Sequence, residues 1–274
     1  MEAAIASVRP AIEAGATRAD LQDLLPPGGG RNALDCAYWE LEAKASRTSV
    51  WQLADVPEPR TLRTTITLGA EAPEAMASAA RALSDAKALK LKLTGDAGVD
   101  AQRVAAVRAA RPNCWIGVDA NQGYAIDTLP ALVDMLITHE VELLEQPLAR
   151  GREADLDGFD RGIPFAADET ALSLADMESL VGRFDVVNIK LDKCGGLTEG
   201  LAIAARAKAL GLGAMVGNMM GTSLSMAPSF VLGQLSDIVD LDGPIFLAAD
   251  RQPSVQYRDG TIWCPDAVWG HAAA

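Results

Sequence analysis

Lysine and acidic side chains stand at the ends of short apolar runs in this sequence of 274 residues. In one such run, Lys90 and Lys92 alternate with Leu89, Leu91 and Leu93. Alternate side chains of a β-strand point to the same face, so both ammonium groups are expected on one face. Burial and mutual repulsion should lower the pKa of at least one of these lysines toward that of a useful base. This pair therefore predicts acid/base chemistry.

Three carboxylates follow in the same way. Asp119, Glu145 and Asp168 each end an apolar run, and one strand-helix unit separates each from the next. If the runs are neighbouring parallel strands, the three side chains converge at one end of the sheet. Bare carboxylates in one place would repel each other, and a hard divalent cation with oxygen ligands resolves the repulsion. The three residues therefore predict a metal site.

Two further runs carry charges at their ends. Lys190 shares a strand face with Asn188, whereas Lys193 falls in the turn before two glycines, so Lys190 is preferred as the functional lysine. Asp240 and Asp242 again alternate on one face. No helix obviously starts there, so these two acids are interpreted as a clamp for a substrate ammonium; a second metal site or helix capping remains open.

These residues require a parallel sheet to position them. From about residue 60, β-rich runs alternate with segments of helical periodicity, for example 74–87, 101–111, 128–138 and 198–210, which predicts an α/β fold. Eight strands with seven helices between them favour a closed (β/α)7β barrel, a modified TIM barrel. In such a barrel the second and sixth strands are opposed, so Lys92 and Lys190 should face each other across the substrate. The expected strands are 64–68, 89–93, 115–119, 141–145, 164–167, 185–191, 213–217 and 238–241.

The two ends of the chain differ from this pattern. Residues 1–60 are expected to form a mostly helical region, with a capping box at Thr17–Asp20, a break at Pro26–Gly30 and a helix over Leu34–Lys44. Residues 61–250 form the predicted barrel. Residues 251–274, broken by prolines and glycines, are expected to return as strand and loop to the N-terminal region.

Composition narrows the function classes. A net charge of -13 repels phosphate backbones and anionic lipids, so neither nucleic acid nor membrane is an expected partner. The four cysteines form no Cys-x-x-Cys pair, and no basic stretch followed by an apolar run opens the chain, which favours a cytoplasmic protein. A small-molecule substrate is therefore expected, and a homo-oligomer is possible for a barrel of this kind.

Taken in order, these motifs resemble the enolase superfamily, in particular its muconate-lactonizing-enzyme subgroup and the dipeptide epimerases of the L-Ala-D/L-Glu type. Lysine bases working beside Mg²⁺ are a known pattern of that superfamily. The matching stretches are Lys90–Lys92, Asp119–Asn121, Glu145–Pro147, Asp168–Glu169, Asn188–Lys190 with Gly195–Gly196, and Asp240–Pro244.

The resemblance implies roles for these residues. Mg²⁺, with Mn²⁺ as the alternative, would bind Asp119, Glu145 and Asp168, and Lys92 and Lys190 would act as the acid/base pair through an enolate. Asp240 and Asp242 would hold the ammonium of a dipeptide. Thr65, Lys90 and Asn218 would contact the substrate.

The resemblance leaves two alternatives. The same site could serve an o-succinylbenzoate synthase, an N-acylamino acid racemase or a cycloisomerase; the Asp240–Asp242 pair argues against substrates without an ammonium. Relatives carry a capping domain of strands and a mobile loop, of which this chain shows only a partial, N-terminally shortened version. A barrel that binds metal or ligand without turnover is therefore the second alternative.

Overall fold

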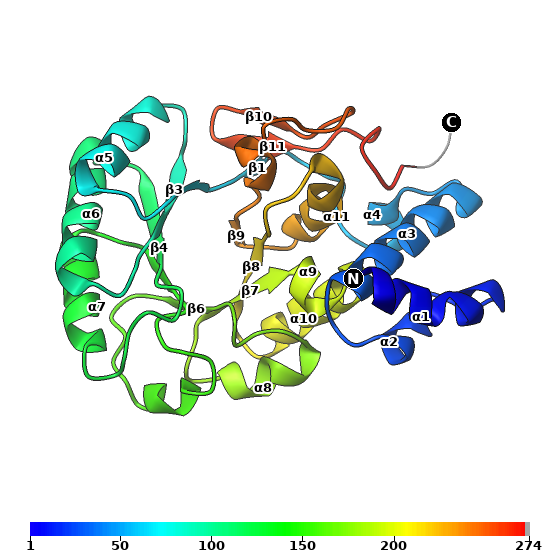
Figure 1. Cartoon of the computed structure of the whole chain (residues 1–274), viewed down its shortest axis with the longest axis horizontal. Coiled ribbons are helices and arrows are strands. Elements are labelled where there is room, and N and C mark those ends of the chain that lie inside the picture. The colour runs from blue at the N-terminus through cyan, green and yellow to red at the C-terminus, as the bar shows by residue number, and fades with distance from the viewer. Residues whose placement is uncertain (272–274) are drawn as a thin grey trace.

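The computed structural model describes residues 1–271. Eight parallel strands form one curved sheet in which each strand pairs with the next along the chain (Figure 1). The backbone N–H of Thr65 donates to the carbonyl of Val239 at 2.9 Å, which brings the first and last strands together. All eight predicted strands are present. They are β2 (Ile66–Leu68), β3 (Ala88–Lys92), β4 (Trp115–Asp119), β5 (Leu143–Glu145), β6 (Phe165–Ala167), β7 (Val186–Lys190), β8 (Gly213–Gly217) and β9 (Ile238–Val239).

Helices cover the outer face of the sheet, although unevenly. The longer ones are α5 (Pro73–Ala82), α6 (Ala97–Ala110), α7 (Leu129–Thr138), α10 (Leu197–Ala209) and α11 (Ser223–Gly233). The prediction of a comparable helix in each connection is wrong for two of them. Only the 3₁₀ turn η1 (Glu153–Leu156) joins β5 to β6, and η2 (Leu174–Asp176) with the short α8 (Met177–Leu180) precedes β7. Residues 150–162 are rich in glycine and charge and lack the apolar spacing that a longer helix would bury.

The interior of the barrel is divided into an apolar layer and a polar layer. The apolar layer is a buried cluster of Leu143, Ala166, Val186 and Met215. Glu145, Asp168 and Asn188 each come two residues after a member of this cluster, and strand side chains two apart share a face. Glu145 and Asn188 lie on β5 and β7, and Asp168 directly follows β6. On β3, Leu89 and Leu91 are fully buried in the main hydrophobic core. The period of two therefore places the charged groups at the carboxyl end of the barrel.

The N-terminal region is helical, as predicted, but its boundaries differ. Thr17 and Asp20 bond reciprocally through side chain and backbone, which confirms the capping box. Helix α3 (Gly29–Ser46) is longer than predicted because Gly29 and Gly30 lie within its first turn, where α1 approaches closely. The sequence interpretation missed α1 (Glu2–Glu13) and α4 (Val50–Leu53). The short α2 (Leu21–Leu24) follows the capping box.

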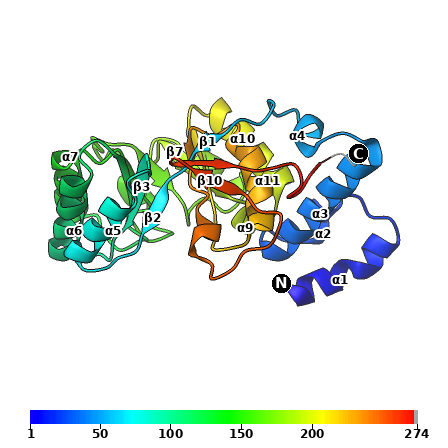
Figure 2. The same ribbon diagram turned by 90° about the horizontal axis from the view of Figure 1, so that it is seen from above.

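The C-terminal tail returns to the N-terminal helices (Figure 2). Strands β10 (Gln256–Arg258) and β11 (Thr261–Trp263) form an antiparallel hairpin, and β11 also pairs with β1 (Leu62–Arg63). Beyond the hairpin, the Trp269 indole donates to the carbonyl of Cys36 at 3.2 Å. The three-part division of the chain at residues 60 and 250 stays a prediction.

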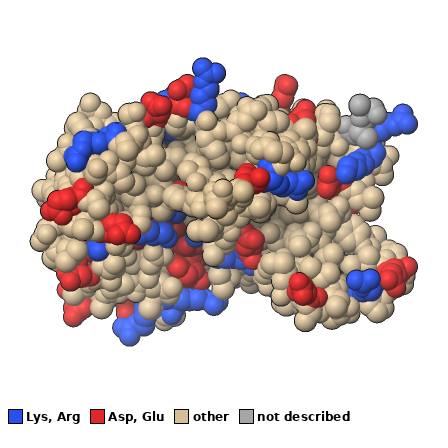
Figure 3. Space-filling model, turned by 45° about the horizontal axis from the view of Figure 1, so that its top comes forward, with Lys and Arg blue, Asp and Glu red and all other residues tan. Residues whose placement is uncertain are grey.

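Acidic and basic side chains are interspersed over the face shown in Figure 3. Within residues 1–271, no helix is both long and apolar enough to cross a membrane.

Candidate active site

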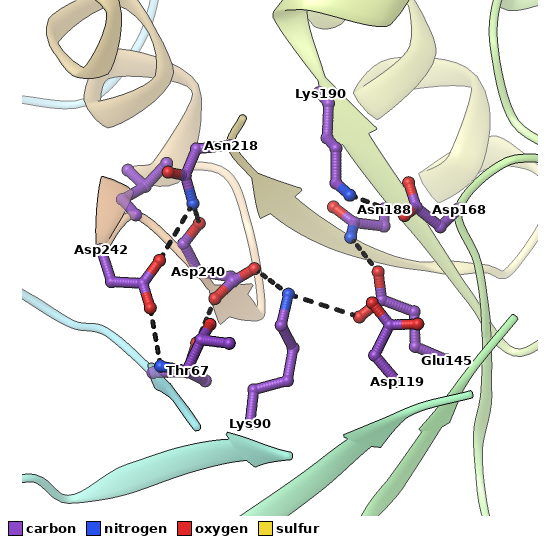
Figure 4. Close-up of polar contacts among 12 residues, drawn as sticks. Thr67, Lys90, Asp119, Glu145, Asp168, Asn188, Lys190, Asn218, Asp240 and Asp242 are labelled. Carbon is purple, nitrogen blue, oxygen red and sulfur yellow. Dashed lines mark hydrogen bonds and ion pairs between the residues drawn. The ribbon is translucent and has the colours of Figure 1, made fainter. Parts of the chain in front are cut away.

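Three buried carboxylates meet at the carboxyl end of the barrel (Figure 4). Asp119 ends β4, Glu145 ends β5, and Asp168 directly follows β6. Each offers an oxygen atom, and these oxygens all lie within 4.8 Å of one another. Their side chains are almost fully buried. The structure therefore brings together the triad that the sequence predicted.

The triad fits a hard divalent cation. Buried carboxylate oxygens normally have a hydrogen-bond partner, but Oε2 of Glu145 has none in the described part of the chain. Its other oxygen, Oε1, accepts from the Asn188 amide at 2.6 Å. Burial, followed by the negative charge of Asp119, raises the pKa of Glu145 to about 8. An oxygen-coordinated cation such as Mg²⁺ would satisfy the orphaned oxygen and remove the repulsion.

Lys92 and Lys190 approach the triad from opposite sides. Lys92 ends β3 and its Nζ lies 2.6 Å from Oδ2 of Asp119. Lys190 ends β7 and its Nζ lies 2.6 Å from Oδ2 of Asp168. In the eight-stranded order, β3 and β7 are the second and sixth strands and are therefore opposed across the barrel. The Lys92 side chain is 31% exposed, whereas that of Lys190 is 8% exposed.

A third lysine, Lys193, belongs to the same cluster, and the sequence interpretation set it aside. It lies in the single-turn helix α9 (Leu191–Cys194), which continues directly from β7. Its ammonium bonds Oδ1 of Asp168, while Lys190 holds Oδ2. Burial opposes ionisation of Asp168, but Lys193 and Lys190 outweigh it and lower the pKa of this carboxyl. The helical turn would have been the signal, because it brings position 193 back over position 190.

The predicted lowering of a lysine pKa is wrong for Lys90. Burial disfavours its charged form, but Asp240 and Glu145 outweigh burial and raise the pKa of Lys90. The same balance raises the pKa of Lys190, where Asp168 is the strongest opposing charge. A neighbouring lysine and burial both lower a lysine pKa, but the barrel also places carboxylates beside each ammonium, and their charges reverse the direction.

Asp240 and Asp242 lie on the far side of Lys90 from the triad (Figure 4). Lys90 links the two places: its Nζ bonds Asp240 and lies 3.7 Å from Oε2 of Glu145. Asp242 accepts from the backbone N–H of Thr67 at 2.7 Å and from the Asn218 amide at 3.3 Å. Burial and the charge of Asp240 raise the pKa of Asp242. The pair is thus a buried acidic site beside the triad.

Thr65 differs from the other predicted substrate-binding residues. Its side chain is buried, and its hydroxyl donates to Asp240. It does not line the cavity that the others share. Direct substrate contact for Thr65 stays a prediction. The contact that the structure shows for its side chain is the hydrogen bond to Asp240.

One cavity of about 580 Å³ extends from Asp168 of the triad to the acidic pair Asp240 and Asp242. Both predicted catalytic lysines, Lys92 and Lys190, line this cavity, together with Lys90 and Asn218. Several other residues line the cavity without a site role predicted from the sequence, because most of them lie in loops and helical turns that follow the strands. These are Thr67, Gly69, Asn121, Glu169, Lys193, Met219, Met220, Gly243 and Phe246.

The geometry agrees with known proteins. L-Ala-D/L-Glu epimerase of Escherichia coli (strain K12) is 40% identical over 260 residues, covering 95% of this chain and 81% of that protein. A solved enolase family member from Agrobacterium tumefaciens, with homology to dipeptide epimerases and with bound sodium and L-Ala-L-Glu, superposes with a TM-score of 0.92. It is 37% identical, and the match covers 98% of this chain and 82% of that one.

A second solved structure contains the expected cation. Dipeptide epimerase from Methylococcus capsulatus, complexed with Mg and the dipeptide L-Arg-D-Lys, is 29% identical with a TM-score of 0.83, covering 89% of this chain and 73% of that one. The family model described as enolase C-terminal domain-like matches residues 74–270. By sequence, fold and the arrangement of its lysines and carboxylates, the chain belongs to the enolase C-terminal domain-like family.

Proposed function

We propose that this protein is an isomerase that epimerises dipeptides at the carbon next to a carboxylate. The observation that carries the proposal is the opposition of Lys92 and Lys190, each bonded at 2.6 Å to a different carboxylate of one triad. Inversion at carbon requires a proton to leave one face and return to the other. Two ammonium-bearing side chains on opposite sides of a cavity meet that requirement.

The proposed substrate position runs from the triad to the acidic pair. Its carboxylate end would lie beside the cation that Asp119, Glu145 and Asp168 would hold, and its free ammonium would lie at Asp240 and Asp242. The two solved relatives described above hold dipeptides, which carry both groups. Lys90, between the two places, would contact the middle of such a substrate.

The triad would hold Mg²⁺, which when bound supplies positive charge that stabilises the negative charge developing on the substrate. Mn²⁺ as a substitute ion stays a prediction; both ions favour oxygen ligands. Asn188 would orient Glu145 through its 2.6 Å bond, and Asn121 through its backbone N–H would orient Asp119 at 2.8 Å.

The proton steps belong to the two lysines. For one diastereomer, Lys92 in its neutral form would remove the α-proton and the Lys190 ammonium would return one to the opposite face. For the other diastereomer the roles exchange. A positioned acid or base is typically worth about 10² to 10⁴-fold in rate, so charge stabilisation must supply most of the acceleration.

A dipeptide library incubated in D₂O with Mg²⁺ and read by mass shift tests the proposal. We expect epimerised dipeptides to gain one deuterium at the α-carbon, since the returning proton comes from a lysine that exchanges with solvent. Epimerisation without any solvent deuterium would contradict the two-lysine reaction. N-acylated amino acids and o-succinylbenzoate precursors are tested in parallel. Turnover of these compounds without turnover of any dipeptide would contradict dipeptide epimerisation and favour the racemase or synthase activity instead.

Two further features of the protein are proposed with the function. A cytoplasmic location is supported by the four cysteines, Cys36, Cys114, Cys194 and Cys264, which are all free. A homo-oligomeric state stays a prediction that light scattering of the purified protein would check.

A further inference from the structure

The N-terminal helix α3 reaches across to the segment that follows Lys190 (Figure 1). Lys190 ends β7, and α9 begins at the next residue and carries Lys193. Gly195 and Gly196 then lead into α10. Any shift of α9 would therefore move the backbone of both lysines that hold Asp168.

Arg31 of α3 holds the last carbonyl of α9. Its side chain is 3% exposed, and Nη2 donates to the carbonyl of Cys194 at 2.6 Å. The same nitrogen lies 3.2 Å from the carboxylate of Glu199 in α10. Carbonyls in the last turn of a helix have no partner within that helix and need one from elsewhere. Arg31 supplies that partner from the N-terminal region.

Asp35, one turn further along α3, holds the start of α10. Its side chain is fully buried, and Oδ2 accepts from the backbone N–H of Thr198 at 3.0 Å while Oδ1 accepts from the Thr198 hydroxyl at 2.6 Å. The N-cap position of α10 is Gly196, which has no side chain to do this. Asp35 therefore performs from α3 the task that an N-cap aspartate performs within a helix.

The two glycines show how closely α3 is fitted to this turn. Gly195 and Gly196 have φ angles of 90° and 124°, a region that favours glycine. A Cβ atom at Gly195 would overlap the Arg31 guanidinium, and one at Gly196 would overlap the Asp35 carboxylate. Nothing larger than a hydrogen atom fits between these glycines and α3, so the position of α3 constrains the position of α9.

We propose that Arg31 and Asp35 are positioning residues that hold Lys190 in place through α9. The inference rests on the proposed function, because it assigns them to only one of the two proton-transferring lysines. Lys92 lies on the opposite strand β3 and bonds Asp119. The segment after it is held by Asp100 of α6, which accepts from the backbone N–H groups of Thr94 and Gly95, and not by Arg31 or Asp35. Loss of Arg31 or Asp35 should therefore impair proton transfer by Lys190 more than proton transfer by Lys92.

The test measures exchange of the α-hydrogen with D₂O separately for the two diastereomers of one dipeptide, in the Mg²⁺-loaded full-length protein. Lys190→Gln first identifies the diastereomer whose hydrogen faces Lys190. We expect Arg31→Met and Asp35→Asn to slow exchange of that diastereomer at least tenfold more than exchange of the other, since a displacement of about 1 Å can cost 10²-fold. Arg31→Lys, which keeps one donor, should recover part of the loss.

Val50→Ala is the matched control, because it loosens the N-terminal region where α4 meets Gly270, away from α9. It should leave the ratio of the two exchange rates unchanged. If Arg31→Met and Asp35→Asn, measured on folded protein, slow both diastereomers equally, the positioning role is overturned. If the wild-type protein exchanges neither diastereomer, the proposed function fails instead, and the two failures are distinguished.

Discussion

Asn188 donates from its amide to Oε1 of Glu145 at 2.6 Å, whereas the buried Oε2 has no hydrogen-bond partner within residues 1–271 and lies 3.7 Å from the Lys90 ammonium. The bond joins β7 to β5 across β6. It fixes the orientation of the Glu145 carboxylate beside Asp119 and Asp168. The proposed metal site therefore depends on a residue that does not itself offer a carboxylate.

The close approach of Gly217 to Asn188 gives a prediction about metal affinity. A Cβ atom at Gly217 would overlap the Asn188 amide and push it away from Glu145. We expect Gly217→Ala to weaken Mg²⁺ binding about 10 to 100-fold, as loss of a residue that orients a metal ligand typically does. Calorimetric Mg²⁺ titration measures the effect.

Asn188→Ala provides the control for this prediction. In that background Gly217→Ala should cause little further loss of Mg²⁺ affinity, because the amide that it displaces is already gone. Full additivity of the two substitutions would show that Gly217 acts by another route.

The raised pKa of Glu145 predicts a pH dependence. Burial and Asp119 raise its pKa to about 8 from an ordinary value of 4.5. Between these values the folded, metal-free protein keeps a proton that the unfolded chain releases. The unfolded state then binds fewer protons, so the free energy of unfolding should fall as pH rises through this window.

Metal binding should show the opposite trend. Mg²⁺ requires the ionised carboxylate, so its affinity should rise roughly tenfold per pH unit up to about pH 8. Mg²⁺ titrations at several pH values check this, with proton release recorded in buffers of different ionisation enthalpy. An affinity that does not change over the range would contradict the assignment of Glu145 as a ligand.

Asp242 offers a test of the substrate's ammonium. It is buried and lines the cavity, and its hydrogen bonds come from a backbone N–H and an amide. Asp242→Asn keeps the shape and removes the charge, so kcat/KM for dipeptides should fall about 10 to 100-fold, the usual worth of a hydrogen bond to a charged group. Steady-state kinetics of the wild-type protein and of Asp242→Asn are measured with a dipeptide, which carries the ammonium, and with its N-acetylated form, which lacks it. Equal losses for both would mean that Asp242 does not bind an ammonium.

The strand ends of the site could be predicted from the sequence because alternation is a local property. Lys92, Asp119, Glu145 and Lys190 follow from the period of two and the order of parallel strands. Lys193 could not be predicted in this way, since a single helical turn after β7 brings it to Asp168. The raised pKa of Lys190 likewise depends on carboxylates from other strands, and no local pattern contains that information.

Long-range contacts also explain the missed features of the fold. Gly29 and Gly30 are typical of a break in sequence, yet they lie inside α3, where Met1 and Ala4 approach so closely that a Cβ atom would be crowded. Arg31 and Asp35 gave no sequence signal, since their partners, Cys194 and Thr198, lie far along the chain.

The opposition of Lys92 and Lys190 is tested most directly by measuring α-hydrogen exchange with D₂O in Lys92→Gln and Lys190→Gln, for each diastereomer of one dipeptide. Each variant should lose epimerisation by about 10² to 10⁴-fold while still exchanging the one diastereomer whose hydrogen faces the remaining lysine. The two variants should retain opposite diastereomers. Retention of the same diastereomer by both variants, or of both diastereomers by either one, would contradict two lysines acting from opposite faces.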